Sequence, residues 1–139
     1  MSGGTDALGA ALAAEHAAIY GYGAIGARLS GPAVAQAQQA EAVHRNRRDA
    51  LVLRLTAVGV TPPAALPAYG LPFPVTDLAS AVRVAVQLEE RTAVLWRLAL
   101  GPSTGDDRKM ALDALIDCAL RAARWRRAAG EQPGTVPLP

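Results

Sequence analysis

Cysteine, lysine and aromatic residues are scarce in this chain. The single cysteine, Cys118, excludes an internal disulfide and a cysteine-rich metal site. Aromatic residues make up only 4% of the sequence although 51% is hydrophobic, and alanine supplies much of that fraction. A β-sandwich would be expected to carry more aromatic and β-branched side chains. The composition therefore favours closely packed helices.

Strong net charge and long apolar stretches are also absent. The formal net charge of +2 is too small to indicate nucleic-acid binding by itself, and no stretch is apolar enough to span a bilayer. Residues 1–6 lack the basic and apolar regions of a signal peptide. We therefore expect a cytoplasmic protein that binds neither nucleic acid nor membrane. Its 139 residues suffice for a single domain, 1–139, with an extended tail from about residue 131.

Apolar residues recur at helical spacing in four segments, which predicts an all-α fold. Short turns around residues 30–31 and 101–105 separate the first helix from the second and the third from the fourth. Glycine and proline in both turns are typical of such helix ends. The expected helices cover about residues 5–29, 32–58, 77–100 and 106–129.

A proline-rich segment separates the second and third helices. Residues 59–76 contain five prolines. An extended path of about 3.1 Å per residue would reach roughly 55 Å, enough to run the length of a helix bundle. Most connections in bundles are far shorter. Two helical hairpins joined by one long crossover are typical of the ferritin-like four-helix bundle, which is the fold we predict.

Ionisable side chains interrupt the apolar faces of three expected helices. Glu41 and His44 lie one helical turn apart on the second helix, and Arg48 follows one turn later. Glu15 and Glu89 lie near the middle of the first and third helices, on their expected inward faces. A charge that faces the core must be paired or bound to a metal, because an isolated buried charge is too costly.

Part of this pattern matches the ligand set of carboxylate-bridged metal bundles. That set takes one glutamate from each of two helices and Glu-x-x-His from each of the other two. Glu15, Glu41 with His44, and Glu89 match it on three helices. The fourth helix offers neither acid nor histidine on its expected inward line. That line consists of Leu112, Ile116, Ala119 and Ala123.

Two interpretations follow from these residues. In the first, Glu15, Glu41, His44 and Glu89 hold iron or manganese in an oxidoreductase-type protein. In the second, Arg48, with Arg47 as a further candidate, takes the place of the metal, and the same four residues form a buried network with it. An arginine near the site favours the second interpretation, since its charge competes with a dication. We therefore expect a non-catalytic domain without a cofactor, and metal binding is the alternative.

Short motifs spread over nearly the whole chain point to a family. They are Ala14–Ala18, His44-Arg45 with Arg47–Asp49, Ala68-Tyr69 with Leu71–Val75, Leu88-Glu89, and Ala123–Arg126. In these motifs the chain resembles a bacterial family of ferritin-like domains of unknown function. The resemblance implies the bundle fold but no particular activity. Ferritin-like relatives with intact sites oxidise iron or activate oxygen.

Small residues dominate the first helix and the start of the second. Gly21, Gly23 and Gly26 lie in the first helix, and residues 33–42 are mostly alanine and glutamine. Small side chains allow helices to approach closely, and symmetric dimers are the commonest oligomers. We therefore expect a homodimer that forms through these two helices.

Overall fold

The computed structural model describes residues 3–130, and within that range it contains four α-helices and no strand. The all-helical prediction is confirmed, and each boundary lies within a few residues of the expected one. The tail predicted from about residue 131 lies outside the described residues. The elements are α1 (Gly3–Ile25), the 3₁₀ turn η1 (Gly26–Arg28), α2 (Pro32–Ala57), α3 (Leu78–Leu100) and α4 (Gly105–Ala128).

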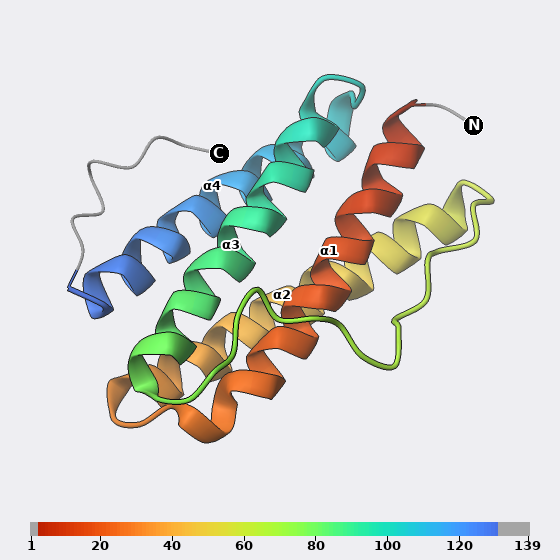
Figure 1. The fold of residues 1–139 in the computed structure, drawn as a ribbon. Coiled ribbons are helices and arrows are strands. Elements are labelled where there is room, and N and C mark those ends of the chain that lie inside the picture. Colours follow the sequence, from red (N-terminus) through yellow and green to blue (C-terminus); the bar gives the residue numbers. More distant parts are fainter. Residues whose placement is uncertain (1–2, 131–139) are drawn as a thin grey trace.

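The helices are arranged as two antiparallel hairpins, α1 with α2 and α3 with α4 (Figure 1). α3 packs against both α1 and α4, and α1 also packs against α2.

Local signals fix the ends of these helices. Asp77 caps α3 by accepting a hydrogen bond of 2.8 Å from the backbone N–H of Ser80. Pro32 begins α2 directly after Gly31, whose φ of 60° suits glycine. No helix between residues 3 and 130 is long and apolar enough to cross a membrane.

Two apolar clusters fill the interior. The first surrounds Trp96 and includes Leu12 and Leu55. The second surrounds Trp125 and includes Ile25 and Val84. Along α1, α2 and α3, the members of the two clusters lie on either side of one polar level, which is formed by Glu15, His44 and Glu89.

Residues 58–77 connect α2 to α3 without forming helix or strand. Figure 1 shows this connection passing over α1 on its way to the start of α3. The side chain of His16 donates a hydrogen bond of 3.0 Å to the carbonyl oxygen of Pro63. The rings of Tyr20 and Tyr69 lie 5.6 Å apart. The connection is thus attached to α1 at two points, where it covers part of the helix face that we expected to form a dimer.

Gly21 lies where α1 packs closely against α3. A Cβ atom at Gly21 would lie 2.6 Å from both methyl carbons of the buried Leu88. We expect Gly21→Ala to destabilise the protein by about 1–3 kcal/mol through overpacking, despite alanine's better helix propensity. A Cβ atom at Gly23 would meet no atom within 4 Å. Gly23→Ala should therefore stabilise the protein by about 0.5–1 kcal/mol.

Urea denaturation of the two alanine variants checks this prediction, since both introduce the same residue into the same helix. A Gly21→Ala variant as stable as Gly23→Ala would show that α1 and α3 can separate at little cost.

Candidate functional site

His44 of α2 lies between two buried carboxylates. Its Nδ1 atom is 2.5 Å from Oε1 of Glu15 on α1, and its Nε2 atom is 2.8 Å from Oε2 of Glu89 on α3. All three side chains are fully buried. Carboxylates only accept hydrogen bonds, so both ring nitrogens are placed to donate, which is the arrangement of a protonated imidazole. The structure thus brings together three of the residues that the sequence singled out.

The opposite charges in this cluster shift the pKa values of His44 and Glu89 towards their charged forms. Burial alone would lower the pKa of His44, but the charge of Glu89 and the hydrogen bonds to both glutamates raise it to about 9. Burial alone would raise the pKa of Glu89, but the positive charges of His44 and Arg121 bring it below its usual value. Near neutral pH the imidazole is therefore positively charged and the Glu89 carboxylate is ionised.

Two aromatic side chains complete the surroundings of Glu89. The Tyr22 hydroxyl donates a hydrogen bond to Oε2 of Glu89, and Trp125 Nε1 donates one of 2.9 Å to the Tyr22 oxygen. The Tyr22 ring also stacks on the His44 ring, with centroids 5.8 Å apart. Burial and the charge of Glu89 raise the pKa of Tyr22 well above its ordinary value. Tyr22 is therefore a permanent donor in this network, and α4 takes part through Trp125.

A chain of ion pairs links Glu89 to the side of the bundle. Nη1 of Arg121 on α4 lies 3.5 Å from Oε1 of Glu89 and 2.6 Å from Oδ2 of Asp117. Arg47 of α2 contacts the same Asp117 oxygen at 2.9 Å. Three carboxylates thus face three cations, so the whole set is electrically balanced. The carboxylates are Glu15, Glu89 and Asp117, and the cations are His44, Arg47 and Arg121.

The structure does not bring Glu41 and Arg48 into this network, so their predicted place in it is wrong. Glu41 pairs with Arg45 at 2.7 Å, and Arg48 pairs with Asp49 at 3.0 Å, all on the outer side of α2. The buried face of α2 runs through Ala40 and His44. Glu41 follows Ala40 by one residue, which turns its side chain about 100° around the helix and away from the core.

Arg121 is the member that the sequence pattern failed to reveal, whereas Arg47 was the further candidate beside Arg48. The predicted inward line of α4 was wrong, because Leu112 and Ile116 are 45% and 48% exposed. The buried face of α4 instead includes Cys118, Arg121 and Trp125. The seven-residue spacing of Cys118 and Trp125, two turns of a helix, was the signal that could have found this face. On α2, Arg47 and not Arg48 points inward.

These side chains do not fit a metal ion in the observed arrangement. Within residues 3–130, no three His, Cys, Asp or Glu side chains converge as metal ligands would. The reason is geometric, since the two nitrogens of His44 are directed at Glu15 and Glu89 and not at a common point. The guanidinium of Arg121 adds positive charge beside Glu89. Glu41, the fourth predicted ligand, lies outside the cluster.

The fold and site define an all-helical domain with a buried, charge-balanced centre. The chain belongs to the family described as Domain of unknown function (DUF4439), whose model matches residues 7–139. A similar solved structure is that of a conserved hypothetical protein, rv2844, from Mycobacterium tuberculosis. The two chains are 43% identical, with a TM-score of 0.86, over 91% of this chain and 96% of that one. No curated protein matches this chain significantly. The expectation of a family of unknown function is thus confirmed, whereas its ferritin-like character stays a prediction.

Proposed function

We propose that this protein is a non-catalytic ferritin-like domain in which a buried ion network stands where related bundles bind metal. The observation that supports this proposal is the engagement of both His44 nitrogens by Glu15 and Glu89. Metal-binding bundles use the same residue types on their inward faces as ligands. Here these groups neutralise one another, and Arg121 supplies the further positive charge that a metal would bring.

The helix arrangement supports the ferritin-like part of the proposal. α2 and α3 run in the same direction, so the connection of residues 58–77 has to return along the bundle (Figure 1). A single long crossover of this kind distinguishes the ferritin-like arrangement from a simple up-and-down bundle. In this proposal the proline-rich sequence serves the crossover by keeping it extended.

The proposed role is that of a structural or interaction domain, without a cofactor, in the cytoplasm. The homodimer through α1 and α2 stays a prediction. Because the connection covers one face of α1, the dimer would have to use the exposed small residues near Gly23 and at the start of α2. Sedimentation velocity at high micromolar concentration distinguishes dimer from monomer.

One observation favours the alternative, which is the binding of iron or manganese. Oε1 of Glu89 is buried and makes no hydrogen bond within residues 3–130, although it forms the ion pair of 3.5 Å with Arg121. A carboxylate oxygen in that state is a potential ligand. A metal there would need His44 to lose a proton and to turn one nitrogen away from its carboxylate, because a protonated nitrogen cannot coordinate.

Metal titration decides between the two functions. We expect protein purified without chelator to contain no stoichiometric metal, and iron(II) or manganese(II) to leave its melting temperature unchanged. A native-state ligand at 100 times its Kd would stabilise the fold by about 2.7 kcal/mol, which is readily measured. A His16→Ala variant controls for metal binding at the second histidine. Stoichiometric metal, or accelerated iron(II) oxidation in air, would instead establish the alternative.

A further inference from the structure

A groove between α1 and α3 is apolar along most of its length. Its volume is about 450 Å³, within the range of roughly 300–1,000 Å³ that is typical of small-molecule sites. Part of the connection forms its rim. The apolar lining includes Ala10, Ala13, Ala17, Leu71, Leu88 and Leu95.

The groove exists because of an unusual helix surface. Between residues 7 and 27 the only side chains of Asp, Glu, Lys, Arg or His type are Glu15 and His16, and both are buried. From residue 7 on, the outer face of α1 therefore carries no charge, whereas a solvent-facing helix surface normally does. Its alanines also leave room beside α3 that longer side chains would fill. A surface that is both uncharged and hollow suits an apolar ligand.

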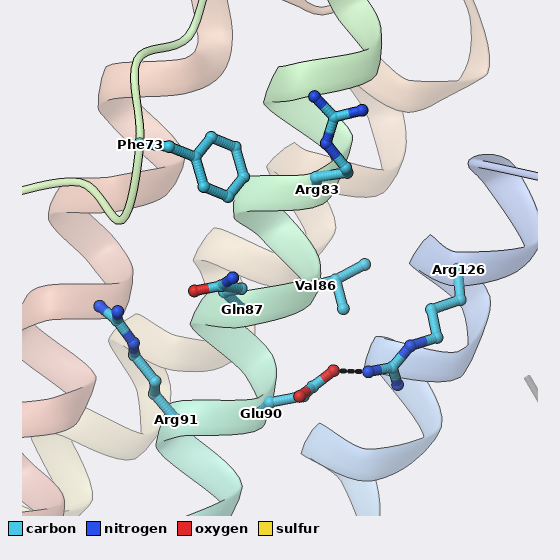
Figure 2. Close-up of a pocket in the computed structure, with 7 residues that line it drawn as sticks. All are labelled: Phe73, Arg83, Val86, Gln87, Glu90, Arg91 and Arg126. Carbon is cyan, nitrogen blue, oxygen red and sulfur yellow. Dashed lines mark ion pairs between the residues drawn. The ribbon is translucent and has the colours of Figure 1, made fainter. Parts of the chain in front are cut away.

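Arg91 lies at the edge of this groove and also lines a second, polar pocket of about 300 Å³ on α3. Figure 2 shows Glu90 directed at Arg126, with which it forms an ion pair, while Arg91 extends to the other side. Arg91 has no ion-pair partner within residues 3–130. Arg83, above the Phe73 ring at 5.7 Å, adds further positive charge to the polar pocket. The apolar groove therefore ends beside uncompensated positive charge.

We propose that this groove binds a medium-chain alkyl carboxylate. The alkyl chain would lie against the alanines of α1, and the carboxylate would pair with the Arg91 guanidinium, which matches a carboxylate in geometry and charge. Ala10 and Ala17 are seven residues apart, which gives an apolar floor of roughly 10 Å at 1.5 Å per residue. That length suits a medium-chain acid better than a long-chain one.

Calorimetric titration with decanoate tests the site on the full chain. We expect saturable binding, and a loss of about tenfold in affinity for Arg91→Gln because a charge-assisted pair is removed. The matched control is Arg97→Gln, another exposed arginine of α3 that does not line the groove. It should bind decanoate as the wild type does. Ala13→Leu, which fills the groove from an exposed helix position, should also weaken binding.

The chain length of the ligand gives an independent readout. Each methylene buried in an apolar groove should raise the affinity by about fourfold, so hexanoate should bind far more weakly than decanoate. Circular dichroism confirms that each variant is folded. Absence of decanoate binding at millimolar concentration, equal losses in the Arg91→Gln and Arg97→Gln variants, or equal binding of hexanoate and decanoate would each overturn the proposal.

Discussion

Replacing Glu89 by glutamine should destabilise the metal-free protein by about 3–5 kcal/mol, because it removes one charge from a buried, balanced set. The carboxylate of Glu89 faces the imidazolium of His44 and the guanidinium of Arg121 at the same time. The amide of glutamine carries no charge and offers only one accepting atom. Whichever way the amide is turned, its NH₂ group faces donors: Arg121 on one side, or His44 and Tyr22 on the other.

Glu41→Gln is the matched control, since it makes the same chemical change on the outer side of α2. The Glu41 side chain is 26% exposed and pairs only with Arg45. Exposed pairs of this type contribute about 0.3–0.5 kcal/mol, so the control should be nearly neutral. Chemical denaturation of both variants and the wild type, each treated with chelator, measures the difference.

The same experiment bears on metal binding. If Glu15 and Glu89 were the ligands of a metal that the chelator has removed, the two carboxylates would repel each other. Neutralising Glu89 would then relieve this repulsion and stabilise the fold. A Glu89→Gln variant more stable than the wild type would therefore contradict the ion network. It would also favour the alternative interpretation, the partial metal site.

The sequence predicted the helices well because their signals are local. Apolar spacing, the Asp77 cap and the glycine and proline residues between helices each act over a few residues. Glu15 and Glu89 were identifiable for a related reason. On α1 and α3 the apolar residues around them define a single inward face, so a charge on that face is conspicuous.

On α4 the sequence could not define the inward face, because two apolar stripes run along the helix. One carries Cys118 and Trp125, which are buried. The other carries Leu112, Ile116 and Leu120, which are about half exposed. Periodicity alone cannot choose between them. In the folded protein the large indole of Trp125 is buried against Tyr22, to which it also donates a hydrogen bond. That choice of face brings Arg121 to Glu89.

On α2 the ambiguity has a different origin. Around His44 the helix carries three arginines within four residues, at positions 45, 47 and 48, and their neighbours are mostly small or polar. A long arginine side chain can reach several directions from one backbone position. Which arginine turns inward is set by its partner on another helix, and Asp117 of α4 selects Arg47. Such a tertiary partner has no local signature in the sequence.

The stability of the protein should fall by about 2 kcal/mol between pH 6.5 and 8.5, or about 1 kcal/mol per pH unit, because the proton on His44 is held more tightly in the folded chain. The pKa of His44 is raised from 6.5 to about 9 in the folded state. The contribution of this proton is therefore complete below pH 6.5 and is lost as the pH rises towards 9. Above pH 8.5 the Cys118 thiol adds to this loss of stability. Burial raises its pKa, so the unfolded chain releases that proton at a lower pH than the folded chain does.

Two measurements on the wild type check this expectation. Urea denaturation at several values between pH 6.5 and 8.5 gives the slope. Nitrogen-15 NMR of the imidazole groups shows directly whether the His44 ring keeps both protons at pH 7.5, and a His16→Gln variant assigns the signals of the two histidines. If His44 had only a packing role, its ring would be neutral at that pH. The stability of the protein would then not change between pH 6.5 and 8.5. Observation of a neutral ring would contradict the ion network, because the buried carboxylate of Glu89 would then lack the positive charge of His44.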